Sequence, residues 1–364
     1  MSHDTPARPA DPQAIARAAD ILGKARNPVI AGLGCDVDGV RAALQLAARI
    51  GAAIDHCSIA HERVELRTLA DSGVMNTTVS EARHRADLIV LAGAGAVAWA
   101  DHGKALADGG GLYSWRGDRG VLCLATGEAR PAHVAVNGDV ATLGDGLPLH
   151  RIVSLIRARL GGRPIGPLPS NGPSAEAIDA VALQMKSASF GVIVVDPEEV
   201  DHVTFDAIQG LIKDLNAETR FTSLSVPAKH HGRGANLVSA WTTGDRLPVG
   251  MGRGYPEQDD WRFDAERLVT SGEADALLWI GVLGGDLPAW SGRVPTVALI
   301  HHGAKANTAD VSVEVGVPGV THGGVLTDSI RDGFTYLEAK SPQPLPTVAS
   351  VVAAIEAAIA GAAP

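Results

Sequence analysis

Residues 51–95, GAAIDHCSIAHERVELRTLADSGVMNTTVSEARHRADLIVLAGAG, contain the pattern that decides the fold. An apolar run at 52–54 leads into a polar loop, and a helix-forming segment, the turn at 71–73 and a charged helix at about 79–85 follow. Ala86-Asp87 then introduces five apolar residues that end at Gly93. A short apolar run with a glycine exit is typical of a strand buried in a parallel sheet. The stretch therefore predicts an α/β fold.

Two loops of this stretch follow predicted strands, at residues 57–63 and 93–101. Ligand sites of open α/β sheets form at the carboxyl ends of the strands. We therefore expect the two loops to border one crevice.

The same strand pattern occurs a second time. Ala274-Asp275 introduces the apolar run 276–280, which ends at Gly281. This repetition predicts two similar α/β halves. Residues 161–173 contain four prolines and form the clearest change of composition, which is typical of a linker.

The composition describes an ordinary globular protein, with 46% apolar and 20% charged residues among 364. The formal net charge of −10 argues against nucleic acid as the main partner, because phosphate binding requires a basic surface. No apolar run reaches the roughly 18 residues of a membrane helix, and the first residues lack the apolar core of a signal peptide. We therefore expect a cytoplasmic protein without a membrane partner.

Cysteine usage fits that expectation. The three cysteines, Cys35, Cys57 and Cys123, have no paired spacing, which favours a reducing compartment. They cannot supply the four thiolates of an iron–sulfur cluster. A nucleophilic Cys57 beside His61 is conceivable, but no pattern indicates a lowered thiol pKa. No G-x-S-x-G motif of a serine hydrolase occurs.

Many of the 13 histidines follow predicted strands. Neither H-E-x-x-H nor a pair of cysteines at ligand spacing accompanies them. We therefore expect structural or interface histidines and no metal.

One basic set is notable in this acidic chain. The segment 229–233, Lys-His-His-Gly-Arg, resembles loops that bind anions through backbone N–H groups. The alternative interpretation is a solvated turn with ion pairs between subunits. The complete candidate set for a polyanionic ligand is Lys229, His230, His231, Arg233, Arg253, His301, His302 and Lys305.

The tryptophans favour assembly with other chains. Four of the six are predicted in loops or at the ends of elements, where an exposed tryptophan is typical of an interface. They are Trp99, Trp115, Trp241 and Trp290.

The order of a His-containing loop, a helix, the LADSG turn at 69–73, a second helix and an Arg-Ala-Asp strand resembles the beta subunit of formylmethanofuran dehydrogenase, a molybdopterin oxidoreductase. It resembles most the cofactor-less beta subunits of bacterial formyltransferase/hydrolase complexes. The resemblance places the family's metal-binding residue at Ala60, followed by His61. It places the family's glycine motif after the strand at Gly93 and Gly95. Ala60 has no ligand atom, so we expect neither pterin nor metal on this chain.

The resemblance also implies the architecture. We expect two Rossmann-like parallel-sheet domains, as in domains II and III of the molybdopterin oxidoreductases. The first would be discontinuous, formed by residues 1–56 plus 172–364, and the second an insert of residues 57–171.

The function implied is that of a non-catalytic structural subunit in a hetero-oligomeric complex of methylotrophic one-carbon metabolism. In the family, that complex transfers a formyl group from tetrahydromethanopterin to a methanofuran-type carrier and hydrolyses it to formate. The basic set could help to anchor the carrier's glutamate chain. The alternative is a redox subunit that binds a molybdenum or tungsten pterin.

Overall fold

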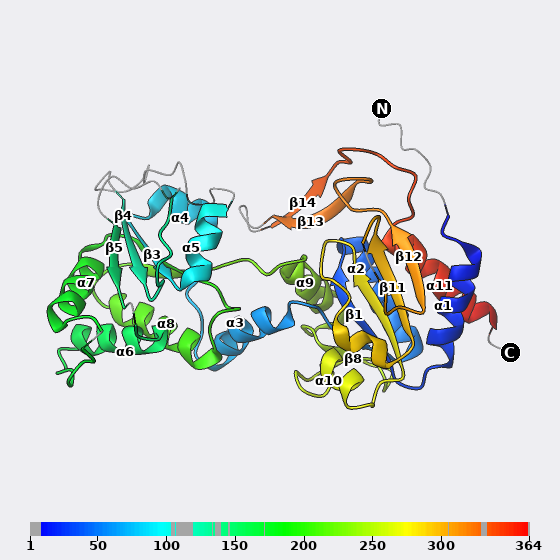
Figure 1. The fold of residues 1–364 in the computed structure, drawn as a ribbon, viewed down its shortest axis with the longest axis horizontal. Helices are drawn as coiled ribbons and strands as arrows, with labels where there is room; N and C mark the ends of the chain where they lie inside the picture. Colours follow the sequence, from blue (N-terminus) through cyan, green and yellow to red (C-terminus); the bar gives the residue numbers. More distant parts are fainter. Residues whose placement is uncertain are drawn as a thin grey trace. The chain divides into compact units, whose positions relative to one another are not determined.

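The computed structural model describes residues 9–102, 106, 119–132, 134, 140–144, 146–170, 172–304, 306–328 and 333–362. The chain forms two compact units (Figure 1). Unit 1 joins Met1–Ile59 to Ala228–Asp328 and Gly333–Pro364, whereas Ala60–Pro227 form unit 2.

Unit 1 is built on a seven-stranded sheet in the order β12-β11-β10-β1-β2-β8-β9. The strands from β12 to β2 run parallel, and β8 and β9 are added antiparallel at one edge. A separate antiparallel hairpin pairs β13 with β14. The strands are β1 (Pro28–Gly34), β2 (Ala53–Ile54), β8 (Val249–Gly250), β9 (Glu257–Gln258), β10 (Ala276–Gly281), β11 (Thr296–His301), β12 (Val311–Val315), β13 (Gly324–Asp328) and β14 (Gly333–Leu337).

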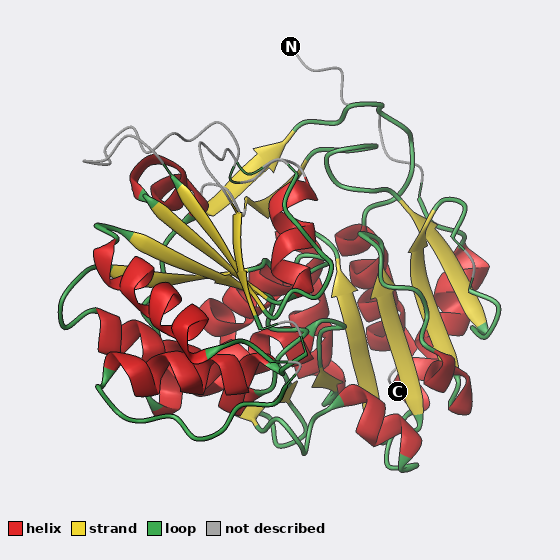
Figure 2. Ribbon diagram, turned by 60° about the vertical axis from the view of Figure 1, so that its left-hand side comes forward, coloured by secondary structure: helices red, strands yellow, loops and turns green. Residues whose placement is uncertain are grey.

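Helices cover both faces of the unit 1 sheet (Figure 2). One face packs against α1 (Pro12–Lys24), α2 (Val37–Ile50), α9 (Gly232–Thr243) and α11 (Val348–Ala362). The other packs against α10 (Ala265–Thr270) and the 3₁₀ helix η2 (Ala289–Arg293). Because both faces are covered, β1 and β10 are buried along their whole length, which explains their continuous apolar sequences.

Unit 2 has an entirely parallel sheet in the order β5-β4-β3-β6-β7. Its strands are β3 (Leu88–Ala92), β4 (Gly120–Leu124), β5 (Val140–Leu143), β6 (Gly191–Val195) and β7 (Phe221–Ser225). One face packs against α6 (Leu149–Leu160), α7 (Ala175–Ser187) and α8 (His202–Leu215), and the other against α4 (Val79–Arg85) and α5 (Ala94–Asp101). Helix α3 (Ile59–Asp71) contains the boundary between the units.

The structure places the second domain boundary away from the predicted one. Strand β6 pairs with β3 and β7 with β6, so residues 172–227 complete the unit 2 sheet instead of returning to the first domain. The proline-rich segment 161–173 connects α6 to α7 within one unit. A loop within a domain and a linker between domains can have the same proline-rich composition. Only the pairing of β6 and β7 shows that residues 161–173 are a loop within unit 2.

The Ala-Asp pairs make the same contact in both units. The Asp87 carboxylate accepts hydrogen bonds from the backbone N–H groups of residues 189 and 190, at 2.8 and 3.0 Å. The Asp275 carboxylate accepts them from residues 26 and 27, at 2.8 and 3.0 Å. In each case the donors immediately precede the neighbouring parallel strand, β6 or β1. Each aspartate therefore joins the amino ends of two adjacent strands.

We predict that Asp87→Ala lowers the free energy of unfolding of unit 2 by about 2–3 kcal/mol, because backbone donors lose their acceptors at a buried site. Asp275 is exposed, so Asp275→Ala should cost only about 1 kcal/mol because water replaces the carboxylate. Urea denaturation of the two variants measures the difference. Equal losses would contradict this account.

Candidate functional site

The candidate site of each unit is the switch point of its sheet, where successive strands are added on opposite sides. In unit 1 this point lies between β1 and β10, and in unit 2 between β3 and β6. Ligands of open α/β sheets bind outside the carboxyl ends of the strands at such points. The loops after these four strands therefore border the positions where a ligand is expected.

The unit 1 switch point is bridged by two histidines. His231 Nδ1 lies 2.7 Å from the carbonyl oxygen of Cys35, which follows β1. His230 Nδ1 lies 3.2 Å from the carbonyl oxygen of Leu283, which follows β10. A carbonyl oxygen only accepts hydrogen bonds, so Nδ1 carries the proton in both rings and donates it. The two imidazoles thus join the loop after β1 to the loop after β10 at the position where a ligand is expected.

The backbone of this histidine pair is strained. His230 and His231 have left-handed φ angles of 54° and 65°. This conformation costs a residue other than glycine about 1–2 kcal/mol. The facing residue is Gly284, where a Cβ atom would lie 2.6 Å from His230 Nδ1. The turn therefore requires both its hydrogen bonds and a glycine opposite.

His56 holds the same turn from the β2 side. Its Nδ1 accepts a hydrogen bond from the Ser58 N–H at 2.9 Å, so Nε2 bears the proton and donates to the His230 carbonyl at 3.1 Å. The Ser58 hydroxyl donates to the Lys229 carbonyl at 3.2 Å. Two hydrogen bonds therefore fix the loop after β2 to the turn before α9.

Burial sets the protonation of this cluster. It lowers the pKa of His56 to about 3, with smaller effects from the neighbouring imidazoles. It also lowers the pKa of His231. Desolvation by the surrounding atoms raises the pKa of the Cys57 thiol to about 11, although part of the residue is exposed. The Cys57 Sγ atom lies 4.0 Å from His56 Nδ1, but that nitrogen already accepts from Ser58. A protonated thiol without a free base is not a nucleophile near neutral pH.

The fold divides the basic set that the sequence predicted. Residues 229–233 form the turn and the start of α9, while His301 ends β11 and His302 follows it at the same carboxyl-end edge. Arg253 lies at the opposite edge, because it follows β8, which runs antiparallel to β2. It pairs there with Glu257 at 3.1 Å. Lys305 lies outside the described residues. Grouping Arg253 with the others is therefore wrong.

Exposure differs within the group at the carboxyl-end edge. His302 is exposed, and its Nδ1 lies 2.9 Å from Glu314. His301 Nδ1 is buried and has no hydrogen-bond partner among the described residues. Lys229 and Arg233 are exposed beside the N-terminus of α9, which no side chain caps. The accessible positive charge therefore lies at these two residues.

Acidic side chains occupy the switch point of unit 2. The N–H of Gly95, in the first turn of α5, donates to Glu199 Oε2 at 2.7 Å. A Cβ atom at Gly95 would lie 2.6 Å from Asp196 Oδ2, and one at Gly93 3.0 Å from Glu199 Oε2. Asp196 and Glu199 follow β6. The chain's own carboxylates thus lie where the resemblance predicted a cofactor.

His61 contacts the same acidic loop. It is buried, and its Nδ1 lies 3.8 Å from Asp196 Oδ1. Burial lowers the pKa of His61, while Asp196 and neighbouring carboxylates oppose the shift. Sequence reasoning missed Asp196 and Glu199. Their signal was an acidic segment directly after an apolar strand, at 196–199.

The residues present do not fit a metal–pterin group. Ala60, at the family's ligand position, has no donor atom and is exposed in the first turn of α3. The Gly95 N–H that an anionic cofactor would need is already bonded to Glu199. Within the described part of the chain, no group of three or more His, Cys, Asp or Glu residues is arranged to hold a metal ion.

The tryptophans have different environments. Trp241 is 55% exposed, as expected, but Trp99 is half-buried and Trp290 packs against Trp279 with ring centroids 6.0 Å apart. Trp115 lies outside the described residues. Trp261, which the sequence did not single out, is 71% exposed.

Comparison with known proteins decides the family. The beta subunit of the formyltransferase/hydrolase complex Fhc from Methylorubrum extorquens is 37% identical over 353 residues, which cover 94% of this chain and 92% of that protein. The chain belongs to the Fhc beta-subunit family. The expected resemblance is confirmed. No family model matches the sequence.

A solved structure supports the same assignment. The crystal structure of the complex FhcABCD from Methylorubrum extorquens, bound to methylofuran, contains a chain that matches with a TM-score of 0.85 and 36% identity over 96% of both chains. The α/β fold with parallel sheets is confirmed. The beta subunit of a tungsten-containing formylmethanofuran dehydrogenase from Methanocaldococcus jannaschii is 27% identical over 274 residues, covering 73% of this chain and 62% of that protein.

No helix that the structure describes is both long and apolar enough to span a bilayer.

We predict that His56→Gln flattens the pH dependence of stability. The folded-state pKa of His56 lies below the ordinary value of 6.5, so below that pH the unfolded chain binds a proton that the folded chain does not. The unmodified protein should therefore lose stability as the pH falls from 6.5, by up to about 1.4 kcal/mol per pH unit from this group. Denaturation midpoints at pH 7 and pH 5 test this. Parallel profiles of the two proteins would refute it.

Proposed function

We propose that this chain is a non-catalytic, structural subunit of a formyltransferase/hydrolase complex. Other subunits of that complex would transfer a formyl group to a methanofuran-type carrier and hydrolyse it to formate. The observation that carries the proposal is the filling of both switch points by the chain's own side chains. Imidazoles occupy one and carboxylates the other. The relationship to the Fhc beta subunit names the complex.

The competing hypothesis is a redox subunit that binds a molybdenum or tungsten pterin. It would require a thiolate at the position of Ala60, because soft metal centres need such ligands. It would also require Glu199 to leave the N-terminus of α5. The residues present therefore favour the structural role.

The structural role predicts assembly without a catalytic contribution. Co-expressed with the three other subunits of its own organism's complex, the chain should co-purify in stoichiometric amount and without molybdenum or tungsten. Cys57→Ser, at its exposed thiol, should leave both activities unchanged. A catalytic cysteine would instead cost about a hundredfold or more when removed. Loss of activity in this variant, or stoichiometric metal on the chain, would contradict the role.

We further propose that Lys229 and Arg233 help to hold the carrier's glutamate chain. Both are exposed at the uncapped N-terminus of α9, where the helix dipole favours carboxylates. Arginine binds carboxylates bidentately, and each exposed contact contributes about 0.5–1 kcal/mol.

The test is the double variant Lys229→Ala/Arg233→Ala in the assembled complex. We expect the carrier to dissociate about tenfold more readily, from the sum of two such contacts, with the difference from the unmodified complex greatest at low salt. The matched control is Arg253→Ala, at the opposite edge of the sheet, which should retain the carrier. Equal retention by the double variant would exclude the anchor.

A further inference from the structure

Exposed apolar side chains of unit 1 gather on α9 and on the β13–β14 hairpin. Trp241 of α9 is 55% exposed and stacks edge-on against Phe334 of β14, with ring centroids 5.2 Å apart. This contact joins the two elements. The α9–hairpin surface consists of Leu237 and Trp241 of α9 with Phe334 and Tyr336, which share one face of β14, and each is between 37% and 64% exposed.

The hairpin is incomplete as it stands. It contains two strands, and no third strand among the described residues pairs with it. Four of the five residues of β14 are exposed. Two-stranded hairpins alone are only marginally stable in water, and an open strand edge with exposed aromatic side chains is typical of a surface that another chain covers.

Helix α9 presents a regular stripe beside the hairpin. Arg233, Leu237 and Trp241 are spaced four residues apart and are all exposed, so they lie on one face of the helix. The buried face of α9, which includes Ala235 and Val238, packs into the core of unit 1. The stripe is therefore fixed in position before any partner binds, which reduces the entropy lost on association.

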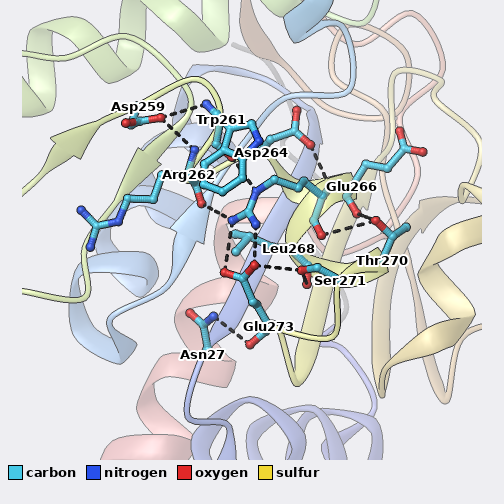
Figure 3. Close-up of polar contacts among 11 residues, drawn as sticks. Asn27, Asp259, Trp261, Arg262, Asp264, Glu266, Leu268, Thr270, Ser271 and Glu273 are labelled. Carbon is cyan, nitrogen blue, oxygen red and sulfur yellow. Dashed lines mark hydrogen bonds and ion pairs between the residues drawn. The ribbon is translucent and has the colours of Figure 1, made fainter.

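The other strongly exposed tryptophan of unit 1 is already engaged. Figure 3 shows the polar network around Trp261. The Arg267 guanidinium lies 4.2 Å from the Trp261 ring centroid, and its Nε donates to the Trp261 carbonyl at 2.7 Å. Glu273 pairs with the same guanidinium. Charged groups of the chain itself thus surround Trp261, in contrast to Trp241.

Charge indicates what kind of partner fits. The exposed cations Lys229 and Arg233 lie at the start of α9, next to Leu237, although the chain as a whole has a net charge of −10. A second copy would bring the same basic border and a like net charge, which disfavours self-association. A different protein with acidic side chains around an apolar patch is complementary. The related Fhc chain was solved within such a multi-subunit complex.

We propose that the α9–hairpin surface is the docking surface for another subunit of the formyltransferase/hydrolase complex, whose acid-bordered apolar patch packs against α9 and β14 together. This inference rests on the proposed function, and it specifies which surface of the chain contacts the other subunits. Trp241 is its anchor, since buried aromatic residues dominate the energetics of interfaces.

Two variants test the surface. Trp241→Ala removes the anchor. Leu237→Glu leaves the Trp241–Phe334 stack in place and sets a negative charge opposite the acidic border. In titrations of the purified full chain against the remaining subunits, each should weaken association at least about tenfold. Trp261→Ala is the matched control and should associate like the unmodified chain. Circular dichroism of each free variant verifies its fold.

The outcomes separate the two levels of the argument. If the unmodified chain binds the other subunits and Leu237→Glu binds equally well, the surface is wrong while the proposed function stands. The surface is also wrong if Trp261→Ala weakens association with the other subunits. If the unmodified chain forms dimers that Leu237→Glu dissociates, the occupant is a second copy and the proposal fails. If the unmodified chain binds none of the other subunits, the proposed function itself fails.

Discussion

The hydrogen bonds that His230 and His231 donate across the unit 1 switch point are the constraint on which this part of the molecule depends. They supply donors to the carbonyls of Leu283 and Cys35, in the loops after β10 and β1. A buried carbonyl that lacks a hydrogen-bond donor destabilises the fold by a free energy comparable to that of a lost hydrogen bond. The same bonds hold two residues in a left-handed turn, and α9 begins directly after it. The direction of α9, and thus of its exposed stripe, follows from them.

The two switch points are filled by groups of opposite character, and the local backbone explains the difference. In unit 1 the loops after β10 and β1 present carbonyl oxygens, so the occupants are imidazole N–H donors. In unit 2 the N-terminus of α5 presents the Gly95 N–H, and the occupant is the carboxylate of Glu199. A helix N-terminus attracts anions through its exposed N–H groups and its dipole. Each side chain thus takes the place that a ligand of matching polarity would otherwise take.

Sequence patterns predicted the strands well because a strand covered on both faces must be continuously apolar, as β3 and β10 are. The Ala-Asp pairs were visible for a related reason, since each aspartate makes a local contact with a neighbouring strand. Glu199 escaped prediction because the acidic segment after β6 does not reveal that its partner is the Gly95 N–H. Arg253 was misplaced because β8 has only two residues, too few to reveal its antiparallel direction. The boundary near residue 171 failed because a proline-rich loop resembles a linker.

The insertion of unit 2 between two parts of unit 1 has a consequence for biosynthesis. The five strands that the structure describes in unit 2 lie between Leu88 and Ser225, so they leave the ribosome before β10, the central partner of β1, has been made. Unit 2 is thus able to fold first, whereas the sheet of unit 1 cannot be completed until β10 to β12 have been synthesised. Once unit 2 has folded, residues 60–227 are compact and no longer count as flexible chain in the loop between β1 and β10. Because closure entropy rises with loop length, early folding of the insert favours assembly of the discontinuous sheet around it.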